Sequence, residues 1–160
     1  HYARDGFYVR GIAMYKKILV PLDGSNASES ILSHVEGLAR ACDATLYFLE
    51  VLEALPPHAT VVVPEMLAEG ASQRADDITH YVQELAESFR NRGLTAEARV
   101  RRGNVAETIL QVASELGVDL IAMSSHDYRG LARIVHGSVA GDVLHRATVP
   151  LLIVRIETTN

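Results

Sequence analysis

The feature that most constrains this chain is the alternation of short strand-like runs with amphipathic segments. Stretches of 8–10 residues rich in leucine and β-branched residues favour strands at 16–23, 44–53, 118–125 and 149–156, and the alternation of segment 95–103 favours a half-exposed strand. Between them, apolar residues recur every three or four positions, as on one face of a helix, over 27–42, 66–92, 104–117 and 137–147. Parallel strands need a crossover, usually a helix, so this alternation predicts an α/β fold: an open five-stranded parallel sheet with helices on both faces.

Composition limits the classes of protein to which the chain can belong. Its 160 residues, 48% of them hydrophobic, suit one globular domain. A net charge of −5 disfavours a nonspecific nucleic-acid binder, and no apolar stretch approaches the roughly 18 residues of a membrane span. The single cysteine, Cys42, excludes an internal disulfide and a multi-cysteine metal site. We therefore expect a cytoplasmic protein with neither nucleic-acid nor membrane partners.

We divide the chain into a peripheral segment and one domain. Residues 1–13 precede the first methionine and are interpreted as a leader or tag-like extension, whereas 14–160 are expected to form the domain. Its longest connections are 54–65, which contains three prolines, and 125–136. Connections of that length in a compact domain are often functional.

Ligands of open parallel sheets bind beyond the carboxyl ends of the strands, where the strand order reverses. Residues 21–25, 50–52 and 123–126 lie at such ends. The carboxylate of Asp23 could reach a ribose hydroxyl there; alternatively, Asp23 or Ser25 only caps the following helix.

A second candidate site lies at Gly137-Ser138-Val139, which opens the last predicted helix. Exposed amides and the helix dipole favour a phosphate there, although Gly-Ser is also a common helix cap. The neighbouring His126 and His136 could meet a phosphate or could simply be exposed loop residues.

Three segments resemble the universal stress protein family: KKILVPLDGS at 16–25, RRGNVAETIL at 101–110 and MSSHDYRGLARIVHGSVAGDVLHRATVPLLIVR at 123–155. The resemblance extends over about residues 15–156 and includes their order and spacing. It implies strand order 3-2-1-4-5 and a homodimer paired through the last strand, 149–156. One branch of the family binds ATP with slow or no hydrolysis, and another binds no nucleotide.

The nucleotide-binding branch carries the pattern Gly-x-x-Gly-x9-Gly-Ser/Thr, from which this chain departs. Gly137 and Ser138 match the final pair, whereas Ser124 and Asp127 replace the first two glycines. At ~4 Å and an effective dielectric constant of 20, the repulsion between Asp127 and a phosphate would be about 4 kcal/mol. A metal ion bridging the two, such as Mg²⁺, would reverse its sign.

The remaining matches imply a site for an adenine nucleotide, ATP or AMP, with Mg²⁺ as an optional partner. By this resemblance, Asp23 holds the ribose, and Pro21 and Val51 contact the adenine. The amides of Gly137, Ser138 and Val139 hold the phosphates. Other positions that match the family's binding site are Leu22, Gly103, Met123, Ser125 and His126.

These observations leave three functions open. We expect a universal-stress-type regulatory homodimer that binds ATP or AMP with little or no hydrolysis, since no residue is an evident general base and none is an evident metal ligand. The alternative is a nucleotide-free interaction module of the same fold, which Asp127 favours. A nucleotidyl-transfer or hydrolytic enzyme is the third, and only His126 or Asp127 could serve it.

Overall fold

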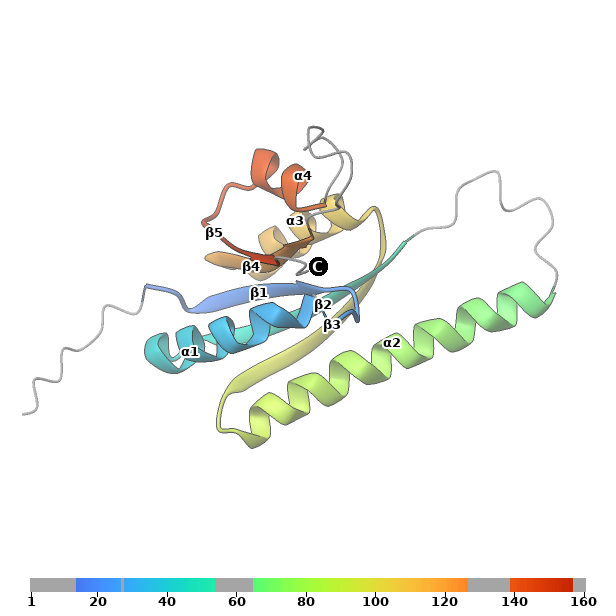
Figure 1. Cartoon of the computed structure of the whole chain (residues 1–160), viewed down its shortest axis with the longest axis horizontal. Coiled ribbons are helices and arrows are strands. Elements are labelled where there is room, and N and C mark those ends of the chain that lie inside the picture. The colour runs from blue at the N-terminus through green and yellow to red at the C-terminus, as the bar shows by residue number, and fades with distance from the viewer. Residues whose placement is uncertain (1–13, 27, 54–64, 127–138, 157–160) are drawn as a thin grey trace, which may run out of the picture.

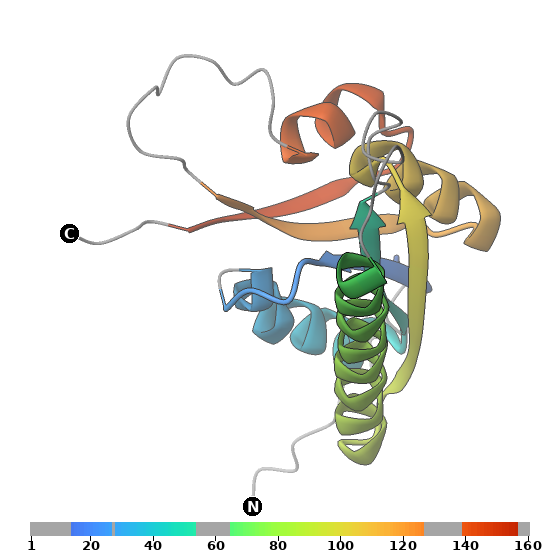
Figure 2. The same cartoon turned by 90° about the vertical axis from the view of Figure 1, so that its right-hand side faces the viewer.

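The computed structural model, which describes residues 14–26, 28–53, 65–126 and 139–156, contains one parallel sheet between two layers of helices (Figures 1 and 2). The sheet has five strands in the order β3-β2-β1-β4-β5, so the predicted fold and strand order are confirmed. The elements are β1 (Lys17–Leu22), a 3₁₀ turn η1 (Ser28–Ile31), α1 (Leu32–Cys42), β2 (Thr45–Glu53), α2 (Glu65–Asn91), β3 (Thr95–Gly103), α3 (Val105–Leu116), β4 (Leu120–His126), α4 (Val139–Arg146) and β5 (Leu151–Ile156). The predicted leader 1–13 and the connections 54–64 and 127–138 lie outside the described residues.

The apolar runs form strands because both faces of the central sheet are covered. Ile18 and Val20 of β1 contribute to a core with α1 and α2, whereas Leu19 contributes to a second core with α3 and α4. Successive side chains of a strand point to opposite faces, so a strand between two helical layers must be apolar throughout. Figure 2 shows α1 and α2 on one side of the sheet and α3 and α4 on the other.

The first α-helix begins later than the sequence predicts. Ala27 was expected to open it, but a 3₁₀ turn comes first and α1 starts at Leu32. The hydroxyl of Ser25 accepts a hydrogen bond from the amide of Ser28 at 3.0 Å, so Ser25 caps this turn and not the α-helix. Apolar periodicity does not distinguish the two helix types over a single turn.

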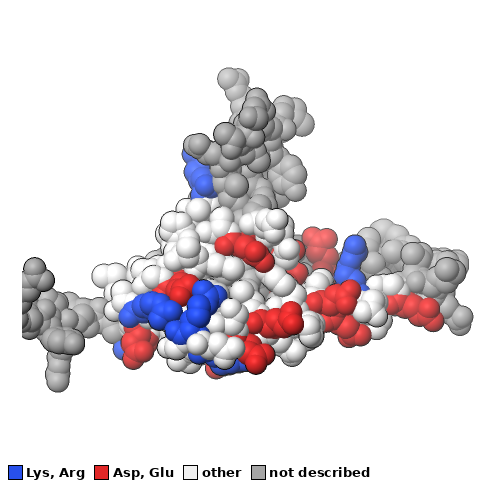
Figure 3. Space-filling model, turned by 60° about the horizontal axis from the view of Figure 1, so that its bottom comes forward, with Lys and Arg blue, Asp and Glu red and all other residues white. Residues whose placement is uncertain are grey.

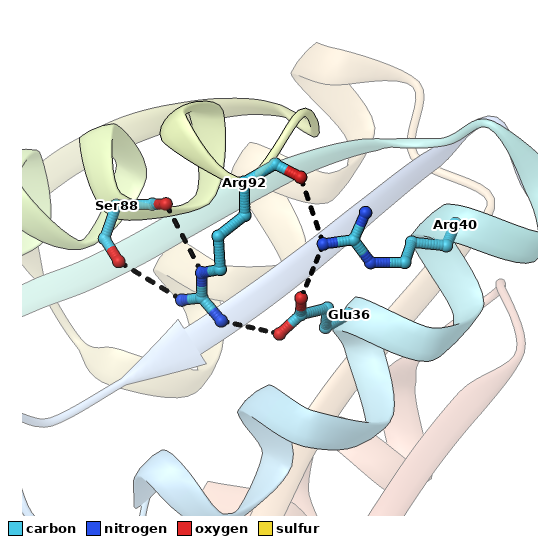
Figure 4. Close-up of polar contacts among 4 residues, drawn as sticks. All are labelled: Glu36, Arg40, Ser88 and Arg92. Atoms are coloured by element: carbon cyan, nitrogen blue, oxygen red, sulfur yellow. Dashed lines mark hydrogen bonds and ion pairs between the residues drawn. The ribbon is translucent and has the colours of Figure 1, made fainter.

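A charged cluster joins the ends of α1 and α2 (Figure 4). The Glu36 carboxylate accepts from Arg40 at 2.8 Å and from Arg92 at 2.6 Å, and Arg92 also donates to both oxygens of Ser88. The hydrogen bond from Arg40 holds the pKa of Glu36 below its usual value. The Arg92 guanidinium also lies 4.1 Å from the ring centre of Phe89, which connects this surface cluster to the core.

Basic side chains gather where the C-terminal ends of α1 and α2 meet, and acidic side chains follow α2 toward its N-terminal end (Figure 3). No helix in the described ranges is both long and apolar enough to cross a membrane.

Replacing Phe89 should test the core between α2 and the sheet. Phe89 is fully buried, and its ring centre lies 4.9 Å from that of Phe48 in an edge-to-face arrangement. Phe89→Ala should lower the free energy of unfolding by about 3–5 kcal/mol, because it removes packing and leaves a cavity. Denaturant unfolding measures this, and Glu87→Ala on the exposed face of α2 is the control, expected within about 0.5 kcal/mol of the parent. Equal effects of the two changes would contradict the packing described.

Candidate functional site

The strand order reverses between β1 and β4. β2 and β3 lie on one side of β1, whereas β4 and β5 lie on the other. β1 and β4 pair only near their amino ends, at Ile18↔Leu120 and Leu19↔Ile121. The pairing of β1 with β2, in contrast, continues to Leu22↔Glu50. The carboxyl end of β1 is therefore the switch point at which sheets of this kind bind ligands.

A cavity of about 490 Å³ lies at the carboxyl ends of β1 and β2. Its volume is in the range of small-molecule sites. One wall belongs to α2, through Ala71, Arg74, Ala75 and Ile78, and the rest of the lining consists of Leu22, Asp23, Glu50, Val51, Leu52, Glu53, Arg102 and Val105. A second cavity of about 450 Å³, lined by residues such as Leu110, Val118 and Val149, contains none of the predicted site residues.

Three predicted site residues, Leu22, Asp23 and Val51, come together at the first cavity. Other predicted residues near the switch point do not line it: Pro21 is buried within β1, Gly103 ends β3, Met123 is buried in the core with α3 and α4, and Ser125 is half-buried near the end of β4.

The predicted phosphate end of the site is described only in part. Val139 is half-buried and begins α4, and His126 ends β4. The side chain of His126, the loop residue Asp127, and Gly137-Ser138 lie outside the described residues.

Asp23 is exposed directly after β1 and is held by a local turn. Its Oδ1 atom accepts from the backbone amide of Ser25 at 2.9 Å and from the Ser25 hydroxyl at 2.5 Å. Gly24 has φ +75°, a conformation that side chains disfavour. Asp23 therefore holds the turn after β1 and does not cap α1. Because it also lines the cavity, the predicted binding role stays open.

Glu50 lies at one of the strand ends where a ligand was expected, but sequence reasoning assigned it no role. It lies on the same face of β2 as Leu46 and Phe48 and is only 3% exposed. Its Oε2 atom is buried without a hydrogen-bond partner. Burial, reinforced by the negative charge of Asp23, raises the pKa of Glu50 to about 7. The available signal was a single carboxylate inside the otherwise apolar run YFLEVL.

A hydrogen bond between α2 and η1 lies close enough to Glu50 to interact with its charge. The Tyr81 hydroxyl donates to a carboxylate oxygen of Glu29, in η1, at 2.6 Å. Burial raises the pKa of Tyr81, and this hydrogen bond and the negative charges of Glu29, Glu50 and Asp23 add to the rise. These groups therefore interact electrostatically, and three of the four are acids.

Gly103 has a structural reason for being glycine. It has φ +150°, and an added Cβ atom would lie 2.7 Å from the Thr108 hydroxyl, closer than real contacts allow. The side chain of Asn104 accepts from the Glu107 amide at 3.1 Å and so caps α3. A side chain at position 103 would disturb the entry into α3. Within the described ranges, no three acidic, histidine or cysteine residues are arranged to hold a metal ion.

The sequence model of the universal stress protein family matches residues 14–155, and the chain belongs to this family. Universal stress protein MJ0531 of Methanocaldococcus jannaschii is 29% identical over 97% of this chain and 91% of its own length. Universal stress protein YxiE of Bacillus subtilis is 33% identical over 89% of this chain and its own full length.

Solved structures agree with the fold. The structure of protein MJ0577, also from M. jannaschii, covers 91% of this chain and 99% of its own at 27% identity, with a TM-score of 0.76. A universal stress protein in complex with cAMP covers 89% of this chain and 98% of its own at 22% identity, with a TM-score of 0.61. At that identity, the cAMP complex shows a shared fold.

Replacing Glu50 should change how folding stability depends on pH. The folded pKa of about 7 exceeds the ordinary value of 4.5, so the folded protein holds a proton that the unfolded chain releases. The parent should therefore lose about 2–3 kcal/mol of stability, relative to Glu50→Gln, as the pH rises from 4.5 to 7. Denaturant unfolding at several pH values measures this difference.

The control for this experiment is Glu53→Gln, on the same strand but exposed. Its difference from the parent should stay nearly constant over the same pH range. Parallel stability curves for the parent and Glu50→Gln would contradict the buried, raised-pKa description of Glu50.

Proposed function

We propose that this protein is a universal-stress-type regulatory protein that binds an adenine nucleotide, ATP or AMP, with little or no hydrolysis. The observation that carries the proposal is the cavity at the carboxyl ends of β1 and β2, next to the switch point, which brings together Leu22, Asp23 and Val51. By the family resemblance, these residues belong to the nucleoside end of the site. The cAMP-bound universal stress protein supports the proposal, because it has the same fold and holds an adenine nucleotide.

The proposed roles follow from position and chemistry. Val51 and Leu22 offer apolar contact to the base, and the carboxylate of Asp23, at the rim, accepts from a ribose hydroxyl. The phosphates would lie toward the start of α4, at Val139 and the preceding Gly137-Ser138, where backbone amides and the helix dipole favour anions. Mg²⁺, where it takes part, would accompany the phosphates.

Weak or absent hydrolysis is proposed for a chemical reason. A general base must reach the water that attacks the terminal phosphate. Among the described residues, the carboxyl with a pKa near 7 is Glu50, which is buried beside Leu22 at the proposed nucleoside end. A base at that end of the nucleotide is poorly placed for this step. We further propose a cytoplasmic location, in which Cys42 would remain reduced.

Calorimetric titration with ATP and with AMP, each with and without Mg²⁺, should detect binding by the parent. Asp23→Asn should weaken binding about 10- to 100-fold, the effect of losing one charge-assisted hydrogen bond. Gly137→Val should abolish binding, because it blocks the approach of a phosphate to the backbone. The matched control is Asp76→Asn, the same chemical change on exposed α2, which should bind like the parent. Absence of binding up to millimolar nucleotide would favour the nucleotide-free interaction module.

We also propose a homodimer paired through β5. β5 is an edge strand, and Leu151, Leu152, Ile153 and Val154 are each half-buried, with two packed against each core. An apolar edge with unpaired backbone groups favours pairing with a second strand.

A charge introduced on β5 should separate the dimer. Leu152→Lys places an ammonium group on the proposed interface, so sedimentation at micromolar concentration should change from dimer to monomer. Gln83→Lys, on the exposed face of α2, introduces the same group away from β5 and should remain dimeric. Circular dichroism confirms that both variants are folded. A parent that is monomeric at high micromolar concentration would contradict the interface.

A further inference from the structure

Glu50 is buried and also carries an oxygen without a hydrogen-bond partner, a combination that is costly for a residue with a purely structural role. Its side chain is almost fully buried, yet its Oε2 atom has no hydrogen-bond partner. An ionised carboxylate in that position lacks both water and a compensating charge, whereas a neutral acid loses much less by burial. Because Glu50 also lines the cavity, whatever occupies the cavity changes its surroundings further.

The groups around Glu50 come from every neighbouring element. They are Asp23 after β1, Glu29 in η1, Glu53 on β2, Tyr81 and Arg74 on α2, and Arg102 on β3. Glu29 already accepts from Tyr81, and Asp23 adds a negative charge next to Glu50. Arg74 and Arg102 line the cavity, but no ion pair joins either of them to Glu50 within the described part of the chain.

We propose that Glu50 is a proton-binding residue of the nucleotide site, so that an adenine nucleotide and a proton bind together. This inference rests on the proposed function. A bound nucleotide displaces water from the cavity and brings its own negative charge, and both effects oppose ionisation of Glu50. The neutral acid can instead donate its proton in a hydrogen bond to the ligand or to the carboxylate of Asp23. The site therefore favours the nucleotide when Glu50 is neutral.

Linkage gives the size of the effect. Burial already raises the pKa of free Glu50 to about 7, and the bound ligand raises it further. Above pH 7, each unit of pH then lowers the affinity by up to a factor of 10, so binding should weaken about tenfold between pH 6 and pH 8.

Calorimetry with AMP tests this directly. Binding is measured at pH 7.5 in two buffers with different ionisation enthalpies, which gives the number of protons taken up. The parent should take up roughly half a proton or more beyond Glu50→Gln, whose amide is neutral at every pH. The phosphate of AMP has a pKa of about 6, but its contribution is common to both proteins and cancels in the comparison. Glu87→Gln, which removes an exposed carboxylate on α2 that does not line the cavity, should behave like the parent.

The outcomes separate this inference from the function on which it rests. If AMP binds both proteins with equal proton uptake and the same pH profile, Glu50 is not the proton-binding residue and the nucleotide proposal stands. If the parent binds AMP at neither pH 6 nor pH 8, both proposals fail. If Glu50→Gln is folded and binds AMP without the parent's tenfold loss of affinity between these pH values, the inference is supported.

Discussion

The structure depends on the burial of β1 between two helical layers. Ile18 and Val20 pack toward α1 and α2, while Leu19 packs toward α3 and α4, so the strand has no solvent-facing side. A polar side chain can reach solvent only at an end of this strand, and Asp23 is the first exposed residue after it. The same constraint that forms the core thus places a carboxylate at the switch point, beside a cavity.

Glu50 is an exception to this separation of apolar strands from polar edges. Its backbone pairs with β1 opposite Leu22, as expected of a residue in β2. Its carboxyl group lies in the buried layer between the sheet and α2, near Tyr81. Burial and the charge of Asp23 both favour the neutral form. A binding site that contains both Glu50 and Asp23 changes its net charge near neutral pH, because Glu50 ionises there. Family membership alone does not indicate this change.

Much of the fold follows from local patterns. The strand and helix segments were predictable because their apolar periods are set by the geometry of one strand or one helix. The cap that Asn104 forms on α3 is equally local, because its partner is three residues away. The predicted start of α1 was wrong, because a 3₁₀ turn and an α-helix have the same apolar pattern over four residues. The cavity wall from α2 was not predicted, because Ala71 and Ile78 meet the end of β2 only after the helix packs across the sheet.

The sequence by itself determined the alternation of elements, the parallel sheet and the family, because these depend on local periodicity and on motif order. It also located Asp23 and Val51 at strand ends. Only the tertiary structure decided that Leu22, Asp23 and Val51 share a cavity and that Glu50 is buried beside Asp23 with an unpaired oxygen. The physical reason is that desolvation of a carboxyl group depends on which distant segments cover it, and η1, β2 and α2 meet only when the chain is folded.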